Sequence, residues 1–132
     1  MNDRTGTVVT HRRYVPYSHA HYAGYLVDGA YSLGLFGDVA TEMCIVLDGD
    51  EGLFASYSDV QFRAPVRAGD VLEITATLVK EGTRSRVMDF AVNVVGRGAP
   101  SDDAPGGAEV LDPPMVATTA TGTVVVPPAP RV

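Results

Sequence analysis

The spacing of apolar residues changes along the chain, and each change marks a different predicted element. Leu26 to Leu47 lies in the longest proline-free stretch, has helical spacing and ends at the turn signal Asp48-Gly49-Asp50. One face of the predicted helix carries Leu33, Phe36, Ala40, Met43, Cys44 and Leu47, and the opposite face carries Leu35, Val39, Ile45 and Val46. Because both faces are apolar, the pattern predicts a helix buried on all sides.

On either side of this helix, apolar residues alternate with polar ones, as in strands with one face on a core. The alternating segments are residues 7–15, 60–64, 72–78, 88–94 and 115–126. Residues 96–114 are rich in Gly, Pro, Asp and Ala and predict a mobile loop, and 127–132 form a proline-bearing tail. Strands grouped after one helix predict an α+β hotdog fold, an antiparallel five-stranded sheet wrapped around one long central helix. We expect one domain over residues 1–132, with its core at about 7–126.

Composition and charge narrow the range of partners. A net charge of -6 argues against nucleic acid, because such binding depends on basic residues that neutralise phosphates. Cys44 is the only cysteine, which excludes an internal disulfide and a zinc cluster built from thiolates. No uninterrupted apolar run reaches the roughly 18–20 residues of a membrane span, and the N-terminus lacks the plan of a signal peptide. These features predict a cytoplasmic protein that binds neither membrane nor nucleic acid.

Two carboxylates lie among the apolar residues of the predicted helix and are the first candidates for catalysis. Asp38 and Glu42 are four residues apart, which places them on one helix face with Thr41 beside them. Burying two acidic groups is costly, and proteins commonly accept that cost where they need a general acid or base. The alternative is that this pair faces solvent or a subunit partner.

The segment before the helix carries side chains suited to orienting a substrate. Ser18 to Gly24 contains His19, His21 and Tyr22, next to the predicted N-terminus of the helix. Unpaired backbone amides at a helix N-terminus favour a developing oxyanion, so a thioester carbonyl bound there would be polarised and its neighbouring carbon acidified. A structural role for His21 remains open, and we expect His11, inside a strand, to be structural.

Metal, thiol and nucleotide chemistry are not indicated. His19 and His21 form neither a helical histidine pair nor part of a thiolate set, so no metal site is predicted. Cys44 is unsuited to be a nucleophile because burial on an apolar helix face disfavours its thiolate. The glycines near the helix start lack the dinucleotide and phosphate-loop fingerprints.

Further short motifs are distributed along most of the chain. They are His21-Tyr22-Ala23-Gly24, Leu26 to Ala30, Leu35 to Glu42, Leu47 to Phe54, Ala64-Pro65-Val66, Gly69-Asp70, Asp112-Pro113-Pro114 and Thr121-Gly122. Together they resemble the 3-aminobutyryl-CoA and β-alanyl-CoA ammonia lyases over roughly residues 7 to 126. The resemblance implies a hotdog fold and a homo-oligomer built on hotdog dimers, a homodimer or a higher assembly such as a trimer of dimers.

The resemblance also implies a reaction. The family reversibly removes ammonia from the β-carbon of an aminoacyl-CoA to give an enoyl-CoA, with coenzyme A as part of the substrate and no metal or redox cofactor. The family's acidic positions match Asp38 and Glu42. We therefore expect Glu42 to take the α-proton and Asp38 to hold the amine, with the two roles open to exchange.

Other side chains are expected to place the thioester. We expect His21 or Tyr22 to orient it and backbone amides near Gly24 and Gly29 to polarise its carbonyl. The substrate-binding candidates besides the catalytic residues are His19, Tyr22, Gly24, Tyr25 and Thr41, and the candidates for coenzyme A phosphates are Arg63, Arg84 and Arg86.

Two departures from the family pattern lie close to the expected site. The family usually reads Lys-Asp-Ala-His-Tyr where this chain has Ser18-His19-Ala20-His21-Tyr22, and it usually has Asn where this chain has Tyr25. A different acyl chain, amine or thioester carrier is therefore an open alternative. The rival functions are a hotdog thioesterase in which Glu42 activates water, a biosynthetic amine-adding enzyme, and a non-catalytic acyl-CoA-binding subunit.

Overall fold

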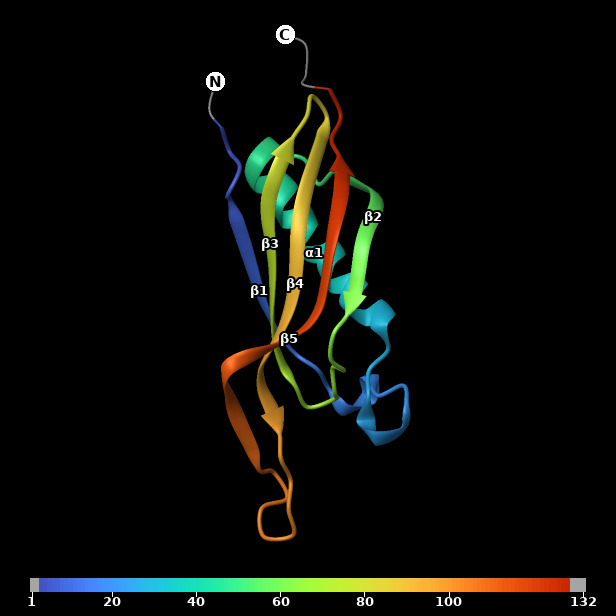
Figure 1. The fold of residues 1–132 in the computed structure, drawn as a ribbon, viewed down its shortest axis with the longest axis vertical. Coiled ribbons are helices and arrows are strands. Elements are labelled where there is room, and N and C mark those ends of the chain that lie inside the picture. Colours follow the sequence, from blue (N-terminus) through green and yellow to red (C-terminus); the bar gives the residue numbers. More distant parts are fainter. Residues whose placement is uncertain (1–2, 129–132) are drawn as a thin grey trace.

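The chain folds as one long helix against one sheet in a computed structural model that describes residues 3–128. The elements are β1 (Val8–Tyr14), the 3-10 turns η1 (Tyr17–His19) and η2 (Ala23–Tyr25), α1 (Gly29–Asp48), β2 (Leu53–Phe62), β3 (Val71–Glu81), β4 (Ser85–Gly98) and β5 (Ala108–Val125). The sheet is antiparallel with strand order β1-β3-β4-β5-β2. Figure 1 shows α1 crossing one face of this sheet. The predicted hotdog fold is confirmed.

The core lies between α1 and the inward faces of β3 and β4. Alternate residues of both strands are buried, as their spacing predicted: Leu72, Ile74, Ala76, Leu78, Met88, Phe90, Val92 and Val94. The ring of Phe36 on α1 stacks on Phe90 with centroids 5.0 Å apart. This contact joins the helix to the middle of the sheet, because Phe90 lies on the central strand β4. Phe90 also lies beside Phe54 of β2.

The helix is not buried on all sides, which corrects the sequence prediction. The face on the sheet carries Ser32, Leu35, Phe36, Val39, Ala40, Met43 and Cys44. On the other face Ile45 and Val46 are 51% and 60% exposed. By length and hydropathy alone α1 could cross a membrane, a test that core helices also pass, and here its buried face packs on the sheet. The helix ends at Gly49, whose φ of 66° is left-handed and whose N–H donates to the Ile45 carbonyl.

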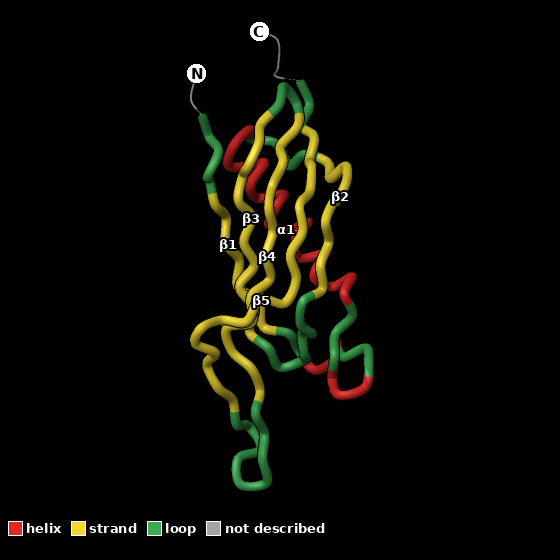
Figure 2. Tube along the Cα trace, viewed as in Figure 1, coloured by secondary structure: helices red, strands yellow, loops and turns green. Residues whose placement is uncertain are grey.

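Two predictions about the strands are also corrected. Most of the predicted loop at 96–114 is a β-hairpin, because β4 and β5 continue pairing from Gly96 with Val110 to Gly98 with Ala108. Figure 2 shows this hairpin projecting beyond the body of the sheet, with only its tip drawn as loop. The second strand begins at Leu53, earlier than predicted, and its last residue, Phe62, is 60% exposed. Residues 129–132 of the predicted tail lie outside the described residues.

Candidate active site

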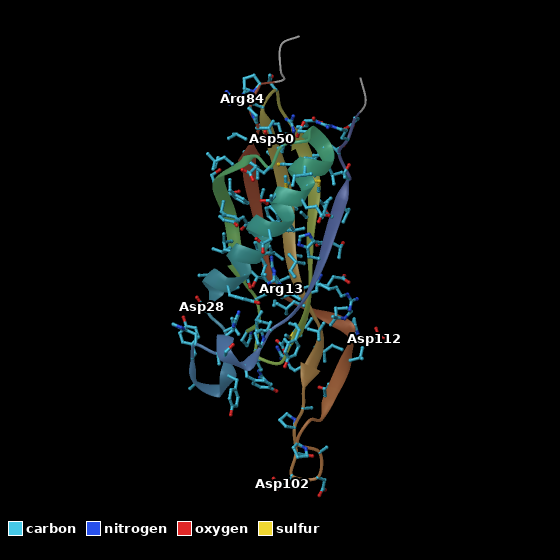
Figure 3. All side chains as sticks on the ribbon, turned by 180° about the vertical axis from the view of Figure 1, so that it is seen from behind. Arg13, Asp28, Asp50, Arg84, Asp102 and Asp112 are labelled. Carbon is cyan, nitrogen blue, oxygen red and sulfur yellow. The ribbon has the colours of Figure 1, made fainter. Side chains whose placement is uncertain are left out.

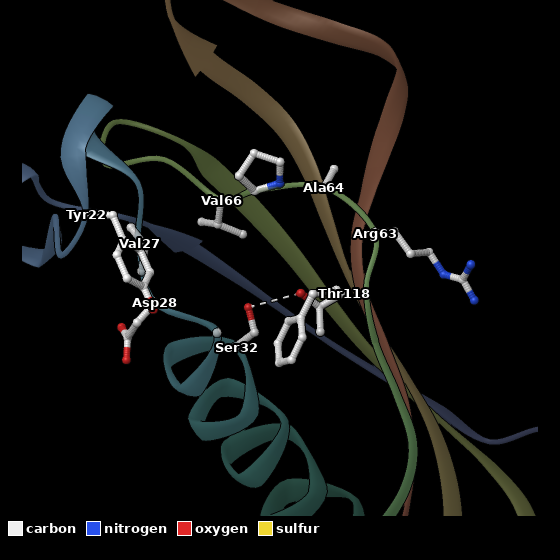
Figure 4. A pocket seen from close by; sticks show the side chains of 11 residues that line it. Tyr22, Val27, Asp28, Ser32, Arg63, Ala64, Val66 and Thr118 are labelled. Atoms are coloured by element: carbon white, nitrogen blue, oxygen red, sulfur yellow. Dashed lines mark hydrogen bonds between the residues drawn. The ribbon is translucent and has the colours of Figure 1, made fainter.

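A cavity of about 420 Å³ lies at the N-terminus of α1. Figure 4 shows it between the first turn of the helix and the chain that leaves β2. Its lining residues are Tyr22, Val27, Asp28, Gly29, Ser32, Phe62, Arg63, Ala64, Pro65, Val66 and Thr118. The cavity is therefore built from four separate parts of the sequence, which the fold brings to one end of the helix.

A short two-stranded ribbon forms one wall of this cavity. Leu26 bridges Arg67, the Val27 N–H donates to the Val66 carbonyl at 2.9 Å, and the Ala68 N–H donates to the Tyr25 carbonyl at 2.9 Å. This ribbon directs the chain into the helix start.

Gly29 allows Phe62 to pack closely against the start of α1. A Cβ at this first helical residue would lie 2.6 Å from the ring of Phe62, inside contact distance. A glycine here thus lets the aromatic ring rest directly on the helix start.

Besides Tyr22 and Arg63, the polar side chains that line the cavity are two hydroxyls and one carboxylate. Ser32 and Thr118 are both buried, and the Thr118 hydroxyl donates to Ser32 Oγ across a long 3.4 Å contact (Figure 4). Asp28 is the N-cap of α1 and is half-buried, yet its side chain makes no capping hydrogen bond. The first amides of a helix have no partner within the helix, so this end can hold a carbonyl oxygen and stabilise negative charge on it.

The predicted residues before the helix are partly brought to this cavity. Tyr22 lines it, and the His21 ring lies edge-on to Tyr22 with centroids 4.6 Å apart. Gly24 and Tyr25 have positive φ angles of 74° and 62° and shape the ribbon. The His19 ring instead packs edge-on against Tyr31 at 5.2 Å, and His19 does not line the cavity.

The predicted helix carboxylates lie elsewhere in this chain. The side chains of Asp38 and Glu42 are 59% and 52% exposed. The prediction that these carboxylates are buried, which made them candidates for catalysis, is therefore wrong for a single chain. Arg13 lies 3.4 Å from Asp38, and His11 Nε2 lies 3.0 Å from Glu42 Oε1. At 1.5 Å per residue, Glu42 is about 20 Å along the helix from Gly29 and Asp38 about 14 Å.

Thr41 is exposed as well, and its hydroxyl donates to the Gly37 carbonyl of its own helix at 2.9 Å. The sequence-predicted site is thus not assembled within one chain. The cavity at the helix start and the open helix face that carries Thr41 and the two carboxylates are separate places.

The three predicted phosphate-binding arginines differ in availability. Arg63 lines the cavity, and its Nε donates to Thr119 Oγ1 at 3.1 Å. The Nε of Arg84 donates to the Val126 carbonyl. Arg86 is 5% exposed and its guanidinium is held by Asp48 at 2.8 and 2.9 Å, so it is not available to a phosphate and that prediction is wrong.

Sequence reasoning missed four residues that the structure places at these sites. Asp28, Ser32 and Thr118 line the cavity, and His11, expected to be structural, contacts Glu42. The spacing of Asp28 and Ser32, four residues apart at the helix start, was the available signal for two of them. Within residues 3–128, no group of three or more His, Cys, Asp or Glu side chains is placed to hold a metal ion.

Comparisons with known proteins agree with this architecture. Residues 26–96 match the family model described as the thioesterase superfamily. A curated 3-aminobutyryl-CoA ammonia lyase from Acetoanaerobium sticklandii is 50% identical over 110 residues, which is 82% of this chain and 85% of that protein. The solved β-alanyl-CoA:ammonia lyase from Clostridium propionicum superimposes with a TM-score of 0.86 at 34% identity, covering 92% of this chain and 86% of that one. A hexameric hotdog fold thioesterase of Campylobacter jejuni, at 18% identity and TM-score 0.70 over 86% of this chain and 78% of its own, shares the fold.

The helix-on-sheet fold and the family match together define the class: the chain belongs to the thioesterase superfamily. Within that superfamily it belongs to the family of 3-aminobutyryl-CoA and β-alanyl-CoA ammonia lyases. The resemblance that its sequence motifs predicted is confirmed. The protein is accordingly a carbon–nitrogen lyase that acts on a CoA thioester.

Proposed function

We propose that this protein reversibly eliminates ammonia from a 3-aminoacyl-CoA, such as 3-aminobutyryl-CoA, to give an enoyl-CoA. The observation that carries the proposal is 50% identity to a 3-aminobutyryl-CoA ammonia lyase over most of both chains. The cavity at the helix start supports it, since it combines helix amides that can hold a thioester carbonyl with polar side chains that can hold the rest of the acyl group.

The thioester carbonyl binds at the first amides of α1, beside Gly29. These amides stabilise the enolate-like charge that develops on the carbonyl oxygen when the α-proton leaves. Tyr22 orients the acyl group, and the buried hydroxyls of Ser32 and Thr118 give the end of the cavity a polar lining. Arg63, at the cavity, is positioned for a coenzyme A phosphate.

Glu42 acts as the base for the α-proton from a second copy of the chain. Within one chain it is about 20 Å from the helix start, too far to reach a substrate held there. The open helix face around it carries the exposed Ile45 and Val46, an apolar surface suited to cover by another protomer. In this proposal the working unit is a homo-oligomer, and Asp38 lies beside the base on the same face.

The proposed reaction is tested by mixing the protein with crotonyl-CoA and ammonium at mildly alkaline pH. Enoyl absorbance and free thiol are followed together, with product mass as a third readout. Loss of enoyl signal without thiol, and a product heavier by one ammonia, is the expected result. Release of thiol would instead identify a thioesterase, and binding without turnover would identify an acyl-CoA-binding subunit.

The two-copy arrangement is tested by mixing two inactive variants. Glu42→Gln lacks the base, and Ser32→Leu fills the cavity while leaving Glu42 in place. Random pairing in a symmetric dimer should return about a quarter of wild-type activity, because one site in each hybrid combines the intact cavity with the intact base. No recovery in hybrids of confirmed composition would place base and cavity in the same chain.

A further inference from the structure

We propose that the Asp28 carboxylate binds the β-ammonium group of the substrate and thereby selects amine-bearing acyl thioesters. The inference rests on the proposed function and deepens it. It also replaces Asp38, which the sequence had suggested for this role. The argument depends on where Asp28 lies, what surrounds it and what the reaction needs at that place.

Asp28 is placed as an N-cap but is not used as one. An aspartate at this position ordinarily accepts a hydrogen bond from an amide of the first helical turn. Here the side chain makes no such bond, and within residues 3–128 its carboxylate has neither a hydrogen-bond donor nor an ion-pair partner. Both the carboxylate and the nearby amides are therefore available to a ligand.

The remaining lining of the cavity does not neutralise this charge. Asp28 is the only acidic residue among the described residues that line it. The one basic lining residue, Arg63, is bonded to Thr119, and Figure 4 shows its guanidinium pointing away from the helix start. A half-buried carboxylate in a cavity that Val27 and Phe62 also line can bind a cationic ligand group through a charge-assisted hydrogen bond.

Two buried hydroxyls make the same end of the cavity polar. Ser32 and Thr118 are each 2% exposed, and Thr118 Oγ1 donates to Ser32 Oγ across 3.4 Å. Ser32 lies one helical turn after Asp28, on the same side of α1. The two hydroxyls are therefore a second polar patch in the cavity, besides the Asp28 carboxylate.

The reaction needs a cation-binding group close to the amides that hold the carbonyl. The amine of a 3-aminoacyl thioester is two carbons from the carbonyl carbon, and Asp28 directly precedes the first amides of α1. During elimination the C–N bond breaks and its electron pair stays on nitrogen. The α-proton moves to the base, the C–H pair becomes the new C–C π bond, and the proton then joins ammonia as ammonium. Asp28 holds the cation in the substrate and again as it leaves.

Asp38 is less suited to this role in the chain. It is exposed, and Arg13 lies 3.4 Å from it. An arginine beside a solvated carboxylate competes with an incoming ammonium group. Among the residues that the structure describes, no basic side chain forms an ion pair with Asp28.

The test compares Asp28→Asn with wild type on two acyl thioesters. Asparagine is an equally good N-cap, so the helix start is preserved while the charge is lost. The kcat/KM for 3-aminobutyryl-CoA and the inhibition constant of butyryl-CoA, which lacks the amine, are measured by enoyl absorbance. Asp28→Glu keeps the charge, and Asp102→Asn removes one charge at the hairpin tip, far from Asp28 (Figure 3).

We expect Asp28→Asn to lower kcat/KM for 3-aminobutyryl-CoA by about ten- to a hundredfold, the value of a charge-assisted hydrogen bond. The inhibition constant of butyryl-CoA should change by less than about threefold, and Asp102→Asn should match wild type on both measures. Asp28→Glu should recover part of the loss. An unchanged kcat/KM, or an equal loss for both thioesters, would overturn the inference.

Failure of the proposed function itself gives a different result. If wild type forms no enoyl-CoA from 3-aminobutyryl-CoA, calorimetric affinities for the two thioesters still test Asp28. A wild-type preference for the amine-bearing thioester that disappears in Asp28→Asn supports the inference in that case. Equal affinities of wild type for both thioesters would sink it.

Discussion

Arg97 holds the completely buried carboxylate of Asp70 through two hydrogen bonds, from Nε at 2.8 Å and from Nη2 at 2.9 Å. The Arg67 N–H donates to the same carboxylate at 2.7 Å, and Arg97 also donates to the Pro65 carbonyl at 3.0 Å. The hydrogen bond to Asp70 is the main cause that raises the pKa of Arg97, and the charges of Asp70 and Glu109 add to it. The pair joins the base of the projecting hairpin to the segment that forms one wall of the cavity.

Arg97→Met should therefore destabilise the protein by about 3–5 kcal/mol, because it leaves the Asp70 carboxylate buried without its cation. Urea unfolding measures the loss. Arg12→Met is the matched control, since Arg12 pairs with Glu73 at the surface and should cost less than about 1 kcal/mol. Equal losses in the two variants would contradict the importance given to burial.

Asp48 should make stability fall in acid. The hydrogen bond from Arg86 is the main cause that holds the pKa of Asp48 below its ordinary value of 3.8, and Arg4 adds to it. As pH falls, the unfolded chain takes up the proton first, so stability is lost from about pH 5 downward through the folded pKa. Urea midpoints between about pH 6 and 3 should drop more steeply for wild type than for Asp48→Asn. Parallel pH profiles would assign the acid sensitivity to other groups.

Glu42→Gln should lower turnover by at least about a hundredfold, because it keeps the shape of the side chain but removes the base. Folding should be little affected, as the side chain is 52% exposed. Glu73→Gln, which removes a carboxylate from the surface pair with Arg12, is the control and should retain activity. Full activity in a correctly folded Glu42→Gln protein would remove the residue from the mechanism.

Cys44 should be unreactive in the folded protein. Burial is the main cause that raises the pKa of its thiol to about 11, with the charge of Asp48 as a further cause. At pH 8, alkylation by iodoacetamide should be more than about a hundredfold slower than for a free thiol, and should recover in denaturant. Rapid alkylation of native protein would show that the thiol is reached through opening of the helix.

The sheet and the helix were predictable because their signals are local. The alternation of apolar and polar residues from Leu72 to Leu78 and from Met88 to Val94 indicates which face of each strand is buried, without knowledge of the element that packs on it. Gly49 indicated the end of the helix in the same local way, since glycine adopts the left-handed conformation of a helix C-terminus at little energetic cost.

The exposed helix face, the hairpin and the role of Asp28 depend on contacts between segments that are distant in the sequence. An all-apolar helix does not say which side stays uncovered, so the exposure of Ile45 and Val46 was not predictable. The hairpin was read as a loop because its Gly and Pro content hides backbone pairing such as Gly96 with Val110. Asp28 reads in the sequence as an ordinary N-cap, and only the missing capping bond and the cavity distinguish it.

The left-handed backbone of Tyr25 restricts how this part of the family can vary. Asn, which the sequence resemblance leads us to expect at this position in the related lyases, enters that conformation readily, whereas tyrosine enters it at a cost. Tyr25 gains an edge-on contact with Tyr17, with ring centroids 5.9 Å apart. In an alignment of the family, positions 17 and 25 should therefore covary: an aromatic residue at 25 should accompany one at 17, while Asn or Gly at 25 should leave position 17 unconstrained.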